Sequence, residues 1–312
     1  MKLVFAPMHG INLAHYRNIF AKHFGGIDTF FTPFIATTSK ERSSYALFKD
    51  VYPENTSHDI HTVPQLLSND GVNFRNFATT IGDMGYEEVN WNIGCPFPTV
   101  TKKVRGSGLM QHPDKVRRLL DEACKGTNYK TSVKMRLGYT SLEEGHVIMD
   151  ILNEYPLSQV IIHGRTGEQK YEGVVDLDGF EALYKQAKHP VIYNGDIYTA
   201  ADYQRIQARF PEIDTFMMGR GLRSNPFLGE DIKGIQRSHD EKLGILRAYH
   251  DDMVDHYFRK FSDDWRVLGN MKEFWTFGPV HLDTRGGFLD RIRRCQDMKT
   301  YYEEVDQLFE NA

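Results

Sequence analysis

The chain has 312 residues, 40% of them hydrophobic and 26% charged, which is ordinary for a globular protein with a substantial buried core. Its net charge of −4 argues against a strongly basic nucleic-acid-binding protein, so any nucleic-acid surface must be a local patch. No stretch approaches the roughly 18 consecutive apolar residues of a membrane helix, and the apolar run after Met1 is too short for a signal-peptide core. We therefore expect a cytoplasmic protein with no membrane segment.

Short β-branched and apolar runs alternate with helical patterns from the N-terminus to about Arg237. Eight parallel strands with intervening helices predict a TIM (β/α)8 barrel. Residues 37–58 are polar and mixed, and they predict a loop with a short helix. The predicted strands are Leu3–Ala6, Thr29–Thr32, Asp59–Leu66, Glu88–Asn92, Ser132–Arg136, Gln159–His163, Val191–Asn194 and Thr215–Met218.

After Arg237 the alternation stops, and helical periodicity continues without strand signals. This pattern predicts a small C-terminal helical bundle, with the barrel over 1–237 and the helical domain over 238–312. The aromatic residues Trp265, Phe274, Trp275 and Phe277 are interpreted as the core of the bundle. The predicted helices are Leu243–Phe261, Asp263–Phe277, Leu289–Arg294 and Asp297–Phe309.

The segment Val89–Pro96 runs an apolar strand into a turn that presents a cysteine between Gly94 and Pro96. The three cysteines, Cys95, Cys124 and Cys295, form no CxxC pattern, so we expect neither a disulfide framework nor a metal site. Cys124 lies in a helical pattern and is interpreted as a packing residue. A single cysteine after a strand is usually a small buried apolar residue, so Cys95 needs further support as a reactive thiol.

That support comes from the other strand ends, because the active site of a TIM barrel lies at the carboxyl ends of its strands. Seven of the eight predicted strands end in polar or glycine-rich motifs. We expect their side chains to converge on one site. These motifs are Pro7-Met8-His9-Gly10, Pro64-Gln65, Asn92–Pro96, Lys134–Arg136, His163–Thr166, Asn194–Asp196 and Gly219–Gly221.

The glycines after the last two strands predict a phosphate site built from backbone N–H groups, and hence a phosphorylated cofactor such as FMN. Arg220 adds a positive charge there. A lysine at a strand end, Lys134, needs a charged partner or a ligand, and facing a flavin it would stabilise negative charge on the reduced ring. The alternative for Lys134 is a Schiff-base lysine of an aldolase.

Taken together, these motifs resemble those of the tRNA-dihydrouridine synthase family, in the order of that family, from about residue 4 to 225. The most specific match is Asn92-x-Gly94-Cys95-Pro96 followed by Gly106-Ser107. The C-terminal part resembles the family's tRNA-binding domain in length and helical character. The other matching segments are Ala6-Pro7-Met8, Gln65, Val133–Gly138, His163–Thr166, Asn194–Asp196 and Gly219-Arg220.

The resemblance implies a flavin that NADPH reduces and that then reduces the C5–C6 double bond of a uridine in tRNA. Cys95 would donate the proton to C5 while flavin N5 gives hydride to C6, and a thiol with a pKa of roughly 8.5 is protonated at neutral pH as this requires. Asn92 would hold the uracil, which must leave any base stack to reach the flavin. The residues implied to hold FMN are Pro7, Met8, His9, Gln65, Lys134, His163, Asn194, Gly195, Asp196, Gly219 and Arg220.

Basic residues that follow or lie near these motifs are the predicted tRNA contacts. They are Lys102, Lys103, Arg105, Arg136 and Arg165, with Arg291–Arg294 as a further candidate. Trp91, Ser68 and Thr32-Pro33 depart from the family pattern and leave the modified uridine open. Two alternatives also stay open: an FMN oxidoreductase acting on a free pyrimidine, and a tRNA-binding paralogue without turnover. A monomer is assumed.

Overall fold

The computed structural model describes residues 1–38, 45–276, 278, 282–283 and 286–312. The chain divides into two compact units, and all eight strands belong to the first. The first unit comprises Met1–Ala14, Asp28–Asp196 and Gln207–Met218. The second comprises His15–Ile27, Ile197–Ile206 and Gly219–Ala312.

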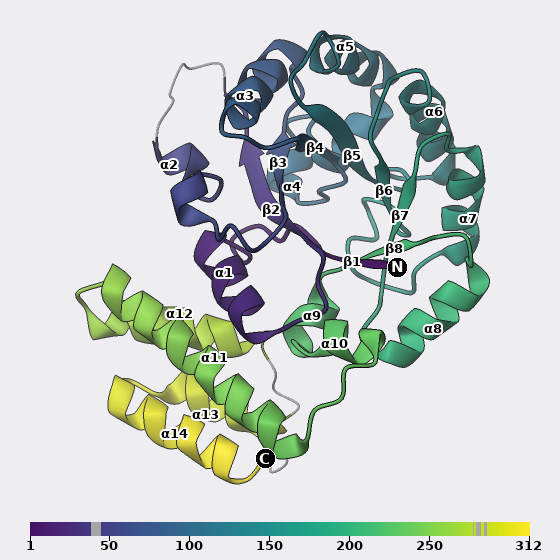
Figure 1. Cartoon of the computed structure of the whole chain (residues 1–312). Coiled ribbons are helices and arrows are strands. Elements are labelled where there is room, and N and C mark those ends of the chain that lie inside the picture. The colour runs from purple at the N-terminus through teal and green to yellow at the C-terminus, as the bar shows by residue number, and fades with distance from the viewer. Residues whose placement is uncertain (39–44, 277, 279–281, 284–285) are drawn as a thin grey trace. The chain divides into compact units, whose positions relative to one another are not determined.

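The eight strands of the first unit are parallel and close into a barrel in the order β1 to β8 (Figure 1). The predicted TIM barrel is therefore confirmed, and β7 and β8 have the predicted bounds. The second strand is longer than predicted because a register shift between Phe31 and Phe34 accommodates Pro33 and lets pairing continue to Ala36. The strands are β1 (Lys2–Phe5), β2 (Thr29–Ala36), β3 (Thr62–Leu67), β4 (Glu88–Ile93), β5 (Lys130–Arg136), β6 (Val160–His163), β7 (Val191–Asn194) and β8 (Thr215–Met218).

Helices follow the strands, and several begin at the capping residues that the sequence supplies. The side chain of Asp70 accepts a hydrogen bond from the N–H of Asn73 at the start of α3, and Asp176 does the same for Gly179 in α7. These helices are α1 (Ala14–His23), α2 (Tyr45–Phe48), α3 (Gly71–Asp83), α4 (Pro98–Thr101), α5 (Pro113–Ala123), α6 (Leu142–Leu152), α7 (Leu177–Gln186) and α8 (Ala200–Arg209), with 3-10 turns at Pro53–Asn55 and Gly106–Gln111.

The inside of the barrel has an apolar layer and a polar layer. Because side chains alternate between the two faces of a strand, residues two positions apart point to the same side. The apolar layer is a buried cluster of Val4, Ala6, Phe31, Val63, Ile161, Ile192 and Met217. Two residues further along three of these strands lie Gln65, His163 and Asn194, which are buried as well. The polar layer thus lies nearer the carboxyl ends of the strands.

The C-terminal part of the second unit is helical, as predicted. Its helix α11 begins at a capping box formed by Ser238 and Glu241. In its core the hydroxyl of Tyr301 meets the ring nitrogens of His250, at 2.8 Å, and Trp275, at 2.9 Å. The helices of this unit that follow β8 are α9 (Arg220–Ser224), α10 (Leu228–Lys233), α11 (His239–Lys260), α12 (Asp264–Thr276), α13 (Phe288–Arg294) and α14 (Met298–Glu310).

The aromatic residues predicted as bundle core have different outcomes. Phe274 and Trp275 are buried, as expected. The prediction is wrong for Trp265, which is 72% exposed. The reason is its helical phase, because Trp265 precedes the first buried residue of α12, Val267, by two positions and so points to the opposite side. Phe277 lies outside the described residues.

Within the described part of the chain, no helix combines the length and the apolar character that crossing a bilayer requires. The same residues contain no group of three or more His, Cys, Asp and Glu side chains placed to hold a metal ion.

Candidate active site

The polar layer brings together predicted site residues from five neighbouring strands. In the strand register Asn92 pairs with Lys134, Arg136 with His163, and His163 with Asn194. Gln65 lies on β3, next to β4, and its amide oxygen accepts a hydrogen bond from Asn92 Nδ2 at 2.7 Å. The residues from β3 to β7 therefore form one continuous polar surface inside the barrel.

The turn that presents Cys95 is organised by the side chain of Asn92. Its Oδ1 accepts hydrogen bonds from the backbone N–H groups of Gly94, at 3.0 Å, and Cys95, at 2.9 Å. Gly94 is close to the neighbouring strand, since a Cβ there would lie 3.2 Å from the carbonyl carbon of Met135. Asn92 thus fixes the path of the backbone at the thiol.

A second segment holds the other side of Cys95. Ser107 donates to the carbonyl oxygen of Cys95 twice, from its backbone N–H at 3.0 Å and from its hydroxyl at 3.1 Å. Gly106 has a left-handed φ of 56°, and a Cβ there would lie only 2.4 Å from the same oxygen. The Gly106-Ser107 pair is therefore in direct contact with the cysteine turn.

Two residues that sequence reasoning missed extend the network around Asn92. The amide nitrogen of Gln65 donates to Asn90 Oδ1 at 2.7 Å, and Asn90 Nδ2 donates to Ser132 Oγ at 2.8 Å. Asn90 and Asn92 alternate along β4 and so share its inner face. That alternation was the signal in the sequence. This chain of hydrogen bonds sets the orientation of each side-chain amide. It directs Nδ2 of Asn92 to Gln65 and Oδ1 of Asn92 to the N–H of Cys95.

The thiol of Cys95 lies in an apolar cluster with Leu67 and Val100, against which Phe34 and Ala36 also pack. Burial raises the pKa of Cys95 above its ordinary value. A hydrogen bond from the backbone N–H of Phe97 and the charges of Arg136 and Lys134 act in the opposite direction. Burial has the largest effect, so the thiol is protonated at neutral pH and can act as an acid.

Lys134 is half-buried, and its ammonium donates a 2.7 Å hydrogen bond to a neutral acceptor, the amide oxygen of Asn194. Burial, and secondly the charge of Arg136, lowers the pKa of Lys134 to about 7. Among the described residues Lys134 forms no ion pair with a carboxylate. An anionic or electron-rich ligand beside it would restore the protonated form, so the site suits such a ligand.

Arg136 joins the cysteine turn to the loop after β6. It donates to the carbonyl oxygens of Gly94, at 3.0 Å, and Thr166, at 2.7 Å. Its guanidinium lies over the ring of Tyr171, 5.4 Å from the centroid, and that ring makes an edge contact with His163. Burial lowers the pKa of Arg136 to about 10, so it stays charged at neutral pH.

Arg165 and Asp196, predicted as a tRNA contact and a cofactor contact, are paired with each other. Arg165 donates from both terminal nitrogens to the two carboxylate oxygens of Asp196, at 3.0 and 2.6 Å, and also to the carbonyl oxygens of Glu172 and Gly173. This pair ties the loop after β6 to the end of β7. Their roles toward ligands stay predictions.

The segment after β1 is turned by Asn12, whose Oδ1 accepts from the N–H of Met8 at 2.8 Å. Pro7 and Met8 are half-buried, whereas His9 is exposed and stacks on Phe34 with 4.5 Å between ring centroids. His9 and Phe34 thus form an aromatic pair next to the cluster that contains Cys95.

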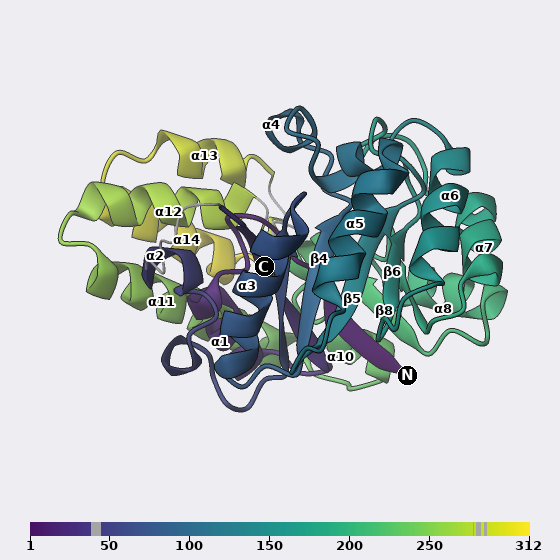
Figure 2. The same cartoon turned by 90° about the horizontal axis from the view of Figure 1, so that it is seen from above.

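The predicted basic loop after Cys95 has two kinds of residue. Lys102 and Lys103 are exposed. Arg105 instead holds the loop to neighbouring segments, since it donates to Asn69 Oδ1 at 3.2 Å and to the carbonyl oxygen of Thr37 at 3.1 Å. Figure 2 shows α4, within this loop, at the carboxyl end of the strands.

The predicted phosphate residues fall in both compact units. Gly195 belongs to the first, and a Cβ there would lie 2.4 Å from the hydroxyl oxygen of Tyr193. Gly219 and Arg220 belong to the second, where the Arg220 guanidinium lies over the ring of Tyr198 at 5.6 Å. A shared phosphate site stays a prediction.

One residue that departs from the family pattern, Trp91, lies outside the polar layer. Trp91 is fully buried on the outer face of β4, where its ring meets that of Phe74 at 6.2 Å and its Nε1 donates to the carbonyl oxygen of Ser68 at 3.1 Å. Trp91 therefore packs between the barrel and α3.

Fold and polar layer together define a protein of the β/α-barrel class, with its polar layer at the carboxyl ends of the strands. Residues 4–264 match the model of the dihydrouridine synthase (Dus) family. The chain therefore belongs to the dihydrouridine synthase family, and the resemblance drawn from its motifs is confirmed.

Two relatives show how far the similarity extends. The tRNA-dihydrouridine synthase B of Pasteurella multocida is 29% identical over 270 residues, which cover 82% of this chain and 78% of that protein. The tRNA-dihydrouridine(16) synthase of Pseudomonas putida is 28% identical over 292 residues, which cover 91% and 84%.

Solved structures are similar in fold alone. Histamine dehydrogenase from Rhizobium sp. 4-9 has a TM-score of 0.56 at 12% identity, and the match covers 75% of this chain but 45% of that one. Morphinone reductase has a TM-score of 0.52 at 12% identity, with 74% and 85% covered.

Proposed function

We propose that this protein is an FMN-dependent tRNA-dihydrouridine synthase that reduces the C5–C6 bond of uridines in tRNA, with NADPH as reductant. The family of the chain and the names of its relatives support this reaction. The observation that supports it most directly is the protonated thiol of Cys95, held by Asn92 and Ser107 at the carboxyl end of the barrel.

The residues of the polar layer fit FMN. Lys134 is a half-buried amine with a pKa lowered to about 7, so an electron-rich ring beside it would stabilise its protonated form. The chemistry that FMN supplies when bound is the delivery of hydride to C6 of the uracil. The residues that would hold FMN are Pro7, Met8, His9, Gln65, Lys134, His163, Asn194, Gly195, Asp196, Gly219 and Arg220.

Cys95 would supply the proton that completes the reduction. Its S–H bond breaks as a C–H bond forms at C5, and the electron pair stays on sulfur as a thiolate. The charges of Arg136 and Lys134 and the N–H of Phe97, all of which lower the pKa of this thiol, would stabilise that thiolate. Water then returns a proton to sulfur.

The division of labour along the chain is part of the same proposal. Residues 1–237 would bind FMN and catalyse the reaction, and residues 238–312 would bind tRNA. Lys102, Lys103 and Arg105 would add contacts to tRNA close to Cys95, with Asn92, Arg136 and Arg165 nearer the uracil.

A direct test uses the purified protein, tRNA that lacks dihydrouridine, and NADPH. We expect a flavin absorbance spectrum, release of FMN on denaturation, and dihydrouridine in the tRNA detected by mass spectrometry. Reduction of free uracil or uridine monophosphate with none in tRNA would instead identify a pyrimidine reductase. A flavin-free protein that binds tRNA without turnover would refute the proposal.

A further inference from the structure

A large apolar side chain is exposed immediately beyond the thiol. Phe97 is two positions after Cys95 and is 49% exposed, although the residues before it, Gly94 to Pro96, belong to a buried turn. Single exposed apolar residues are common on protein surfaces and need no explanation by themselves. Phe97 differs because its backbone is fixed to the reactive sulfur.

The position of Phe97 is set by its backbone on both sides. Its N–H donates a hydrogen bond to the sulfur of Cys95, and its carbonyl oxygen accepts from the N–H groups of Val100, at 2.8 Å, and Thr101, at 3.0 Å. Pro96 and Pro98 restrict φ on either side of it. A rigid segment therefore presents the ring at a fixed place beside the thiol.

Two cations follow on the same loop. Lys102 and Lys103 come directly after α4 and are both exposed, and neither forms an ion pair within the described part of the chain. Arg105 anchors the end of the loop to Asn69 and Thr37. An exposed aromatic ring next to unpaired cations is the combination that binds single-stranded nucleic acid, because bases stack on rings and phosphates attract ammonium groups.

We propose that Phe97 stacks on the base next to the target uridine, while Lys102 and Lys103 bind the phosphates that flank it. This inference rests on the proposed function, since it assumes that a uridine in RNA reaches Cys95. Such a uridine must leave its stack, and its departure uncovers one face of the adjacent base. Phe97 is close enough to the thiol in sequence and structure to cover that face.

The test is equilibrium binding of an unmodified tRNA transcript to the flavin-loaded protein at several salt concentrations. Phe97→Ala should raise the dissociation constant about 5- to 100-fold, the range for loss of one base–aromatic stack, and Phe97→Trp should restore binding. The slope of log K against log[salt] should stay unchanged in both. Lys102→Ala and Lys103→Ala should each reduce that slope by about 0.7.

The matched control is Val147→Ala, which removes an exposed apolar side chain (48% exposed) from the middle of α6. It should bind the transcript as the wild type does. NADPH-driven flavin reduction should also stay at the wild-type rate in Val147→Ala, because α6 contributes no residue to the polar layer.

The proposal is overturned if Phe97→Ala binds within twofold of wild type, or if Val147→Ala loses as much affinity. Failure of the proposed function is a separate outcome. If the wild-type protein forms dihydrouridine and Phe97→Ala binds tRNA normally, the proposed function holds and the proposed role of Phe97 is refuted. If the wild-type protein binds tRNA through Phe97 but forms no dihydrouridine, the binding surface holds and the proposed function is refuted.

Discussion

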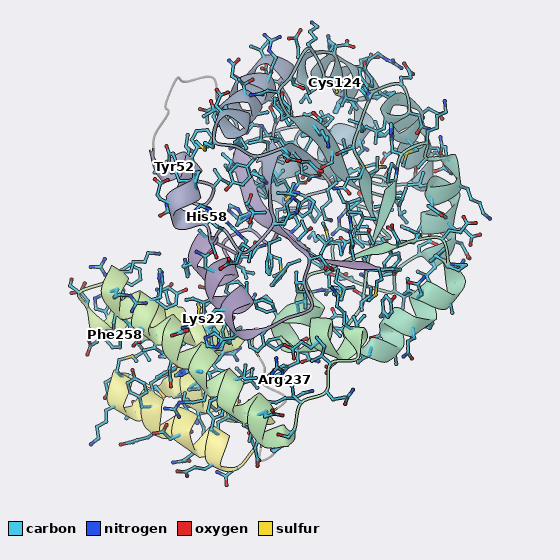
Figure 3. All side chains as sticks on the ribbon, in the orientation of Figure 1. Lys22, Tyr52, His58, Cys124, Arg237 and Phe258 are labelled. Carbon is cyan, nitrogen blue, oxygen red and sulfur yellow. The ribbon has the colours of Figure 1, made fainter. Side chains whose placement is uncertain are left out.

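The two cysteines of the barrel unit, Cys95 and Cys124, both have a raised pKa, but their surroundings differ. Burial raises the pKa of both, for Cys124 to about 11. Cys124 ends helix α5, where its N–H donates to Leu120 and Glu122 as at many helix ends. Figure 3 shows it among the outer helices.

Cys95 differs in the number of groups that fix its backbone. Asn92 accepts from its N–H, Ser107 donates twice to its carbonyl oxygen, and Arg136 donates to the preceding carbonyl oxygen of Gly94. The comparison teaches that the pKa alone does not identify the functional thiol. What distinguishes Cys95 is a backbone held from both sides and two cations near the sulfur.

Removal of the thiol should have the largest effect. Cys95→Ala should reduce dihydrouridine formation about 10²- to 10⁴-fold, the usual contribution of a positioned general acid. FMN content and NADPH oxidation should stay close to wild type, because the hydrogen bonds that hold Gln65, Lys134 and Asn194 do not involve the sulfur. Loss of flavin from Cys95→Ala would show that the thiol is structural, like Cys124.

The cation near Cys95 gives a pH dependence with a definite sign. The pKa of Lys134 is lowered to about 7 in the ligand-free protein, so above this pH the amine is mostly neutral. A ligand that favours the ammonium form raises this pKa, and binding then takes up a proton. The affinity for FMN should therefore fall as the pH rises above about 7.

Lys134→Met should bind FMN about tenfold more weakly at pH 7, the loss expected for a hydrogen bond to a charged group, and its affinity should not vary between pH 7 and 9. Lys134→Arg keeps the charge and should bind with no such pH dependence. Titration of the apoprotein with FMN measures all three. A wild-type affinity that rises with pH would contradict the role given to Lys134.

A comparison of two glycines tests whether the Gly106-Ser107 pair positions Cys95 or is only an ordinary turn. Gly106 and Gly126 have similar left-handed φ values, 56° and 50°. A Cβ at Gly106 would lie 2.4 Å from the carbonyl oxygen of Cys95, whereas nothing lies within 4 Å at Gly126, close to Cys124. Gly126→Ala should thus cost about 1–2 kcal/mol of stability from backbone strain alone.

Gly106→Ala should destabilise the protein by more than Gly126→Ala and should also slow uridine reduction several-fold, because the turn that places the thiol must shift. Thermal unfolding and turnover per bound flavin measure the two effects. Equal unfolding temperatures and equal turnover for the two variants would mean that the Gly106-Ser107 pair does not position Cys95.

Much of this arrangement could be predicted from the sequence. The eight strands followed from alternating patterns, and the polar strand ends followed from the rule that barrel chemistry lies at carboxyl ends. The bounds of β2 were missed because a register shift at Pro33 interrupts its pattern. Trp265 was assigned to the bundle core on composition, whereas its helical phase places it in solvent.

The contacts within the site could not be predicted, because they depend on which side chains meet across strands. Nothing local to Arg165 or Asp196 shows that they pair with each other, since the ion pair joins the ends of β6 and β7. The same holds for Asn90 and Ser132, because their hydrogen bond also joins two strands, β4 and β5. Strand register, which side-chain volume and hydrophobicity determine collectively, decides these contacts.

The smallest effect should come from the other cysteine. Cys124→Ala removes a half-buried thiol at the end of α5, and we expect a change in unfolding free energy of about 1 kcal/mol or less. Dihydrouridine formation should stay within about twofold of wild type, because none of the groups that fix Cys95 contacts α5 at this point. Alkylation followed by mass spectrometry adds a second readout: labelling of Cys124 should keep increasing with pH up to about 11, its raised pKa, since the thiolate is the reactive form. If Cys124→Ala lowered turnover as far as Cys95→Ala, a backbone held from both sides would not be what distinguishes the functional thiol.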